Sequence, residues 1–186
     1  MEKSRLLFSG SGGQGVITAA ILMAEAAVRY ELLNAVQTQS YGAAARGGAT
    51  RSDLIIWDKP IYFPKVIQAN VLICLTQEAF NKYHETIRPG GWMIADSALV
   101  KDTGNVDARR IELPLYETVM DTIGKPMVLN ICMLGAVAAV TGLVRLESIK
   151  SVIAERFGKE FQKTNYTALD LGADLVRRFY PELTPS

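Results

Sequence analysis

Residues 6–17 read Leu-Leu-Phe-Ser-Gly-Ser-Gly-Gly-Gln-Gly-Val-Ile, and this stretch decides the fold class. The apolar run Leu6–Phe8 lacks polar alternation, which is typical of a strand buried on both faces of a parallel sheet. Gly10, Gly12 and Gly15 follow with the Gly-x-Gly-x-x-Gly spacing of a strand-to-helix turn. Such a turn presents backbone N–H groups at a helix N-terminus, where a phosphate can bind.

Each glycine of this turn has an expected role. We expect Gly10 to take a positive φ, Gly12 to keep the path of a ligand clear, and Gly15 to let helix and strand pack closely. Together with Gly13 and Gln14, these residues form the candidate binding turn. The alternative is that the glycines only make a tight turn, or dock the backbone of a partner protein.

A complete dinucleotide site needs a second anchor, which this sequence lacks. An Asp or Glu about 20 residues after the glycines, at the end of the second strand, usually binds the ribose hydroxyls. The second predicted strand, residues 34–38, reads Asn-Ala-Val-Gln-Thr and carries no acid. Glu31 precedes this strand and would lie at the wrong end of the sheet. Ordinary NAD binding is therefore disfavoured.

Length and composition predict one compact domain over residues 1–186. The chain is 49% apolar and 21% charged, as in globular proteins with a substantial core. Its net charge of +1 gives no reason to expect nucleic acid or a membrane as partner. Cys74 and Cys132 stand alone in apolar runs, so we expect buried thiols in a reducing cytoplasm and no metal or iron–sulfur site on this chain.

Strand-like and helix-like segments alternate along the chain. This order predicts an α/β, Rossmann-like, open and mostly parallel sheet with helices on both faces. The alternation in residues 49–57 favours a strand with one solvent or partner face. Pro89–Gly91 reads as a turn, and the apolar run Met127–Leu146 as a buried core or interface helix rather than a membrane span. The other predicted strands are 71–75, 92–95 and 109–113, and the predicted helices are 16–30, 76–80 (first turn), 115–123, 148–157 and 161–179.

The sequence offers few catalytic groups, and we predict no catalytic residue. His84, the single histidine, lies in a helical context without a partner motif, so solvated helix surface is the simpler interpretation. Neither a Gly-x-Ser-x-Gly nucleophile motif nor a P-loop is present. Arg46 and Arg51 accompany a second glycine-rich segment and are suited to a phosphate or carboxylate, or to a salt bridge with a partner subunit. Residues 37–48 are expected to line the crevice beside the first glycine turn.

Two glycine-rich segments together resemble one known family. Residues 10–16 (Gly-Ser-Gly-Gly-Gln-Gly-Val) and 39–48 (Gln-Ser-Tyr-Gly-Ala-Ala-Ala-Arg-Gly-Gly) resemble the signature elements of the gamma subunit of 2-oxoacid:ferredoxin oxidoreductases. The resemblance continues over nearly the whole chain, through residues that include Asn130, Leu134, Gly135, Glu147, Asn165 and Gly172. Family members often carry Pro-Glu where this chain has Ala43-Ala44, while Arg46, Gly47 and Gly48 keep their register.

The resemblance implies a subunit of a larger enzyme. In that family, alpha, beta and delta-type subunits hold thiamine diphosphate, Mg²⁺ and iron–sulfur clusters, and oxidative decarboxylation of a 2-oxoacid yields an acyl-CoA and reduced ferredoxin. The gamma subunit is associated with the coenzyme A side of the active site and binds no cofactor tightly. The resemblance also implies that the enzyme is of the 2-oxoglutarate type and that the isolated chain has no activity. Implied coenzyme A contacts are the turn residues together with Tyr41, Arg46, Gly47 and Gly48.

Three other interpretations remain open from the residues. The chain is also compatible with the beta subunit of an indolepyruvate oxidoreductase, which shares the first glycine motif. A stand-alone NAD(P)-dependent Rossmann oxidoreductase is a different class, disfavoured by the missing acid. A subunit with a purely structural role in assembly is the third.

Overall fold

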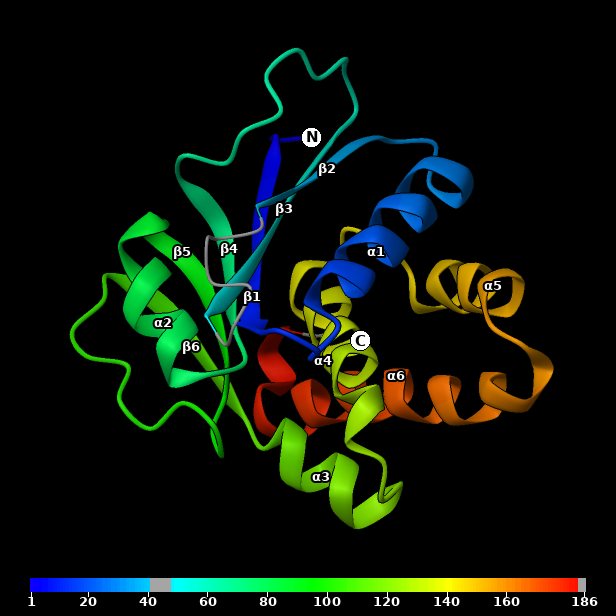
Figure 1. The fold of residues 1–186 in the computed structure, drawn as a ribbon. Coiled ribbons are helices and arrows are strands. Elements are labelled where there is room, and N and C mark those ends of the chain that lie inside the picture. The colour runs from blue at the N-terminus through cyan, green and yellow to red at the C-terminus, as the bar shows by residue number, and fades with distance from the viewer. Residues whose placement is uncertain (41–47, 184–186) are drawn as a thin grey trace.

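The protein forms a six-stranded sheet with helices on both sides (Figure 1). The computed structural model describes residues 1–40 and 48–183. The strands lie in the order β2-β3-β1-β4-β5-β6. Their bounds are β1 Ser4–Ser11, β2 Asn34–Ser40, β3 Ala49–Trp57, β4 Ala69–Cys74, β5 Ile87–Asp96 and β6 Ala108–Leu113. The helices are α1 Val16–Tyr30, α2 Gln77–Tyr83, α3 Leu115–Thr122, α4 Leu129–Thr141, α5 Leu146–Arg156 and α6 Lys159–Phe179.

The sheet is mostly parallel, as predicted. β1, β4, β5 and β6 run parallel to one another, whereas β3 is antiparallel to both β1 and β2. The chain therefore crosses from β1 through α1 to the outer strand β2, and then returns as β3 to fill the place between them. Because β3 begins with Ala49 opposite Ser11, the end of β2 and the start of β3 lie at the same edge of the sheet as the glycine turn.

The prediction of an open face on residues 49–57 is wrong. Leu54 and Ile56 belong to the larger core cluster, Ile55 belongs to the smaller cluster on the opposite face, and Ser52 is also buried. A strand in the interior of the sheet is covered on both sides, and its polar residues are satisfied by neighbours. The Ser52 hydroxyl, for example, accepts a hydrogen bond from the Gln37 amide at 2.8 Å.

The two faces of the sheet are covered unequally. Figure 1 shows α1, α4, α5 and α6 together on one side, where most of the apolar side chains form the larger core cluster. The other side carries α2 and connecting segments over a smaller cluster that includes Leu7, Leu72 and Phe80. The helix expected from residue 76 is confirmed, since the Thr76 hydroxyl accepts from the Ala79 N–H at 3.1 Å and caps α2.

The apolar run Met127–Leu146 contains the central core helix α4, as predicted. Two glycines let α4 and α6 touch backbone to backbone: a Cβ on Gly135 would lie 1.9 Å from the Leu169 carbonyl oxygen, and one on Gly172 would lie 1.8 Å from the Cys132 carbonyl oxygen. Within the described ranges, no helix combines the length and the apolar character that crossing a bilayer requires.

One predicted turn is instead part of a strand. Pro89–Gly91 lies inside β5, which begins at Ile87, and the pairing with β4 shifts register between Ala69 and Val71. The irregularity admits both Pro89 and the positive φ of Gly90 (68°) without ending the strand.

Candidate functional site at the glycine turn

The glycine turn joins β1 to α1 at the carboxyl edge of the parallel strands. Gly13 (φ 90°) and Gly15 (φ 71°) take left-handed conformations, and Gly15 is the N-cap of α1 without a side-chain cap from any described residue. The expectation of a positive φ at Gly10 is wrong, because Gly10 continues β1 opposite Thr50. Gly12 and Gly13 have open space where a Cβ would be, so ligand atoms can approach this backbone closely.

Gln14 closes the inside of the turn. Its Oε1 accepts a hydrogen bond from the Ser11 N–H at 2.8 Å, and its Nε2 donates to the Leu75 carbonyl at 3.5 Å. A Cβ on Gly10 would lie 2.6 Å from that same Oε1, so the glycine makes room for the glutamine. Gln14 thus ties the turn to the end of β4, at the point where α1 and α2 leave the sheet on opposite faces.

Asn130, on α4, supports the glycine turn through a hydrogen bond. Its Nδ2 donates to the Gly15 carbonyl at 3.1 Å, and a Cβ on Gly15 would lie 2.5 Å from the same nitrogen. The close contact that requires glycine at this position is therefore with α4, and not with the strand as expected. Asn130 is only 6% exposed, and its Oδ1 has no hydrogen-bond partner among the described residues. An unpaired buried acceptor is costly, so the lack of a donor for this oxygen distinguishes Asn130 from the other buried polar side chains.

A cavity of about 460 Å³ opens between the turn and the helices. The Asn165 amide and the Thr18 and Thr164 hydroxyls make no side-chain hydrogen bond within the described chain, and Lys125 makes no ion pair there. An apolar pocket with a few convergent polar groups is the usual form of a small-molecule site. The cavity is lined by Gly13, Gly15, Thr18, Lys125, Met127, Val128, Asn130, Ile131, Phe157, Phe161, Thr164 and Asn165.

The second glycine-rich segment lies partly outside the described residues, which leave out the predicted contacts Tyr41, Arg46 and Gly47. Gly48 is described, half-buried, directly before β3. The next residue, Ala49, pairs with Ser11 and donates its N–H to the Glu78 carboxylate at 3.2 Å. The structure thus brings Gly48 beside the turn at the carboxyl edge, as the sequence predicts for this segment.

Arg51 and His84 have partners within the chain. The Arg51 guanidinium forms two hydrogen bonds with the Asp53 carboxylate, at 2.6 and 2.9 Å, and a third with the Val66 carbonyl at 2.6 Å. His84 ends α2, where its ring stacks on Phe80 at 5.1 Å between centroids. Arg51 is therefore engaged in holding β3, and His84 is part of the helix end.

The described residues outside the glycine turn include acids and cysteines that are buried or paired. They contain no group of three or more His, Cys, Asp or Glu side chains that could hold a metal ion. Burial raises the pKa of the Cys74 and Cys132 thiols to about 12, so neither is a thiolate at neutral pH. Glu31 accepts hydrogen bonds from Ser148 and Arg145 and ties α1 to α5, far from the ribose position of a dinucleotide site.

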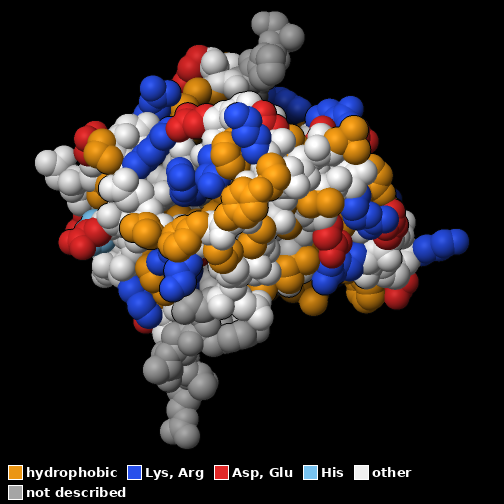
Figure 2. Space-filling view, turned by 90° about the horizontal axis from the view of Figure 1, so that it is seen from above, with side chains coloured by type: hydrophobic (Ala, Val, Ile, Leu, Met, Phe, Trp, Pro, Cys, Tyr) orange, Lys and Arg blue, Asp and Glu red, His pale blue; other side chains and the backbone are white. Residues whose placement is uncertain are grey.

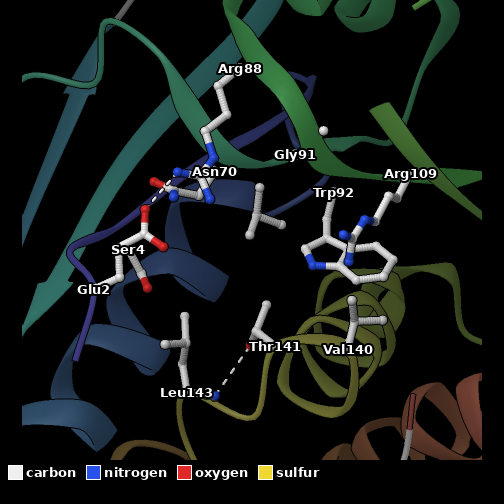
Figure 3. Close-up of a pocket in the computed structure, with 12 residues that line it drawn as sticks. Glu2, Ser4, Asn70, Arg88, Gly91, Trp92, Arg109, Val140, Thr141 and Leu143 are labelled. Carbon is white, nitrogen blue, oxygen red and sulfur yellow. Dashed lines mark hydrogen bonds and ion pairs between the residues drawn. The ribbon is translucent and has the colours of Figure 1, made fainter. Parts of the chain in front are cut away.

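A second cavity, of about 240 Å³, lies at the opposite, amino edge of the parallel strands. Figure 3 shows Arg88 and Glu2 facing each other across one side of this cavity, joined at 2.6 Å, while Arg109 lies along Trp92 on the other. The Arg109 guanidinium is 5.0 Å from the centre of the Trp92 ring. These charges are already held by the chain itself, so the glycine-turn cavity is the stronger candidate for a ligand.

The chain is an α/β domain with a mostly parallel sheet and a cavity at its glycine turn. The chain belongs to the pyruvate ferredoxin/flavodoxin oxidoreductase family, whose model matches residues 5–175. It is 38% identical over 177 residues to the 2-oxoglutarate synthase subunit KorC of Methanocaldococcus jannaschii, covering 94% of this chain and 95% of the relative.

Solved structures agree with this assignment. The gamma subunit of a keto/oxoacid ferredoxin oxidoreductase from Geobacter sulfurreducens has a TM-score of 0.88 and 34% identity, with 100% of both chains covered. A 2-oxoglutarate:ferredoxin oxidoreductase from Magnetococcus marinus, with 2-oxoglutarate, coenzyme A and succinyl-CoA bound, has a TM-score of 0.87. At 19% identity, with 96% of this chain and 32% of that chain covered, this second likeness shows the fold. The predicted family and fold class are confirmed.

Proposed function

We propose that the chain, as a single domain over residues 1–186, is the gamma subunit of a cytoplasmic 2-oxoglutarate:ferredoxin oxidoreductase. Its partners are alpha, beta and delta-type subunits, which hold thiamine diphosphate, Mg²⁺ and iron–sulfur clusters. The complex converts the oxoacid and coenzyme A to an acyl-CoA and passes electrons to ferredoxin. The isolated chain has no activity, because the described residues supply no group that could carry out the decarboxylation or accept its electrons.

The role of this chain is to bind part of coenzyme A at the glycine turn. The carrying observation is the apolar cavity beside the glycine turn, whose lining includes the buried Asn130 with its unpaired Oδ1. The pantetheine arm combines apolar carbons with amide groups, so it suits an apolar cavity that carries a few amide and hydroxyl groups. Phosphate groups are suited to the N-terminus of α1 and to Lys125 at the cavity.

The remaining predicted contacts belong to the same proposal. Gly12 and Gly13 give the ligand access to the backbone, while Gly10, Gly15 and Gln14 hold the turn in shape. Tyr41, Arg46, Gly47 and Gly48 are proposed as further contacts with coenzyme A. Arg46 would bind a phosphate in bidentate fashion.

The test is coenzyme A kinetics in the assembled complex, purified anaerobically through a tag on this chain. Lys125→Ala and Asn130→Ala are each expected to raise the KM for coenzyme A roughly three- to tenfold, as the loss of one hydrogen bond or exposed charge contact implies. The KM for the oxoacid should stay unchanged. Arg46→Ala is expected to act in the same direction.

Matched controls separate this effect from general damage. Asn34→Ala and Lys82→Ala replace exposed residues of the same types, at the start of β2 and on α2 across the sheet from the cavity, and should leave every constant as in wild type. An unchanged KM for coenzyme A in all three site variants would refute the binding role. If the tagged chain is recovered alone and binds NAD(P)H tightly, a stand-alone dehydrogenase is favoured instead. If it co-purifies with an indolepyruvate-specific partner, the chain is the beta subunit of an indolepyruvate oxidoreductase.

A further inference from the structure

The segment of residues 58–68 has no regular secondary structure and is anchored to the core at Val66. Val66 is buried in the smaller core cluster, and its carbonyl accepts the 2.6 Å hydrogen bond from Arg51. Its N–H donates to the Asp53 carboxylate at 3.2 Å. The segment also contains two prolines, which restrict its backbone. These contacts fix the backbone of the segment next to Val66.

Three large apolar side chains of this segment point to solvent. Tyr62 is 90% exposed, Phe63 is 54% exposed and Ile67 is 71% exposed. Two of them, Phe63 and Ile67, line a shallow cavity of about 410 Å³ together with Arg5, Lys65 and Gln68. Exposed aromatic and aliphatic side chains on one short segment are characteristic of a docking surface.

Basic side chains surround the apolar ones. Lys3, Arg5, Lys59 and Lys65 all lie on this segment or on the adjoining start of β1. Lys3 and Lys59 both lie over the Trp57 ring, with their Nζ atoms 4.5 and 5.8 Å from its centre. Figure 2 looks onto this end of the molecule and shows hydrophobic side chains gathered in the middle of the face with Lys and Arg side chains on both sides.

The acidic side chains Asp58 and Glu2 of the same region already form ion pairs. The Asp58 carboxylate accepts from the N-terminal amine at 2.6 Å, and that of Glu2 pairs with Arg88 at 2.6 Å. No described ion pair engages Lys3, Lys59 or Lys65. The face therefore keeps an excess of positive charge, which repels a second copy of the same face and attracts an acidic partner.

We propose that the amino-edge patch, formed by Tyr62, Phe63, Ile67, Lys59 and Lys65, docks an acidic segment of a partner subunit that also carries apolar side chains. This inference rests on the proposed function, since it assumes a multi-subunit complex. The patch lies at the amino edge of the parallel strands, whereas the coenzyme A cavity lies at the carboxyl edge. A partner held here leaves the glycine turn accessible.

The test measures the Kd between this chain and the purified complex of the remaining subunits. Lys59→Glu/Lys65→Glu is expected to raise the Kd roughly tenfold or more at low ionic strength, with a difference that shrinks as salt is added. Tyr62→Ala/Phe63→Ala is expected to raise it by a similar factor at every salt concentration. The matched controls Lys163→Glu and Phe179→Ala alter an exposed lysine and a half-exposed phenylalanine on α6 and should leave the Kd unchanged.

Each other outcome overturns the inference. If wild type assembles and both patch variants assemble equally well, the patch is not the docking surface, although the proposed function stands. If wild type itself does not bind the remaining subunits, the proposed function fails and the inference with it. Self-association of the isolated chain that Tyr62→Ala/Phe63→Ala abolishes would name a second copy as the occupant. Binding of a single-stranded RNA probe that the charge reversal abolishes would name nucleic acid.

Discussion

Replacing Gly172 by alanine is expected to destabilise the protein by about 2 kcal/mol through the contact between α4 and α6. The added Cβ would lie 1.8 Å from the Cys132 carbonyl oxygen, while real Cβ atoms essentially never approach closer than 3.0 Å. The two helices must therefore separate by more than 1 Å along most of their shared surface. Overpacking of this kind costs about 1–3 kcal/mol, and the obstacle here is rigid backbone, which places the cost at about 3 kcal/mol. The higher helix propensity of alanine returns about 1 kcal/mol.

Urea denaturation followed by circular dichroism measures this change, and a fall in Tm of roughly 4–8 °C should accompany it. Gly12→Ala is the matched control, because nothing lies within 4 Å of its Cβ and its φ is not positive. Its free energy of unfolding should stay within about 0.5 kcal/mol of wild type. A Gly172→Ala protein as stable as this control would refute the argument that α4 and α6 meet backbone to backbone.

Two further predictions concern titratable groups. Burial raises the pKa of Cys74 and Cys132 to about 12, so both thiols should resist alkylation at pH 8 in the native protein and react fully in denaturant. Because the folded state favours the protonated thiols, their contribution to the free energy of unfolding is complete below pH 9 and is lost as the pH rises toward 12. Burial alone would raise the pKa of Glu31, but hydrogen bonds from Ser148 and Arg145 outweigh it and lower the pKa. Glu31→Gln should therefore cost about 1 kcal/mol in urea denaturation at pH 7, a difference that disappears as the pH falls through the lowered pKa. Rapid native alkylation, or equal stability of the glutamine variant at pH 7, would contradict them.

Short-range patterns in the sequence predict most of the fold. Leu6–Phe8 and residues 71–75 are short unbroken apolar runs, which are typical of strands in the interior of a parallel sheet. Thr76 is recognisable as a cap because its hydroxyl acts within three residues. These signals are local, so they survive without knowledge of the rest of the molecule.

Long-range placement is what the sequence does not reveal. The alternation in residues 49–57 is the same for a half-exposed strand and for one whose polar residues are paired by neighbours, as Ser52 is by Gln37. Gly15 marks a close approach, but its partner Asn130 is 115 residues away. An asparagine inside the most apolar run of the chain is the signal that could have indicated a buried polar role there. That signal could not have indicated that the asparagine contacts the glycine turn.

The position of β3 between β1 and β2 also determines which part of the sheet opens most easily. Among the described strands, β2 is an outer strand that pairs with β3 alone, so one row of hydrogen bonds holds its amide protons, while two rows hold β1. Local fluctuations that release β2 leave the rest of the sheet intact. Because β2 ends at the same edge as the glycine turn, hydrogen–deuterium exchange along β2 should slow when coenzyme A or a partner covers that edge. The exchange rate of the β2 amides thus reports whether the carboxyl edge is covered, without a label on the ligand.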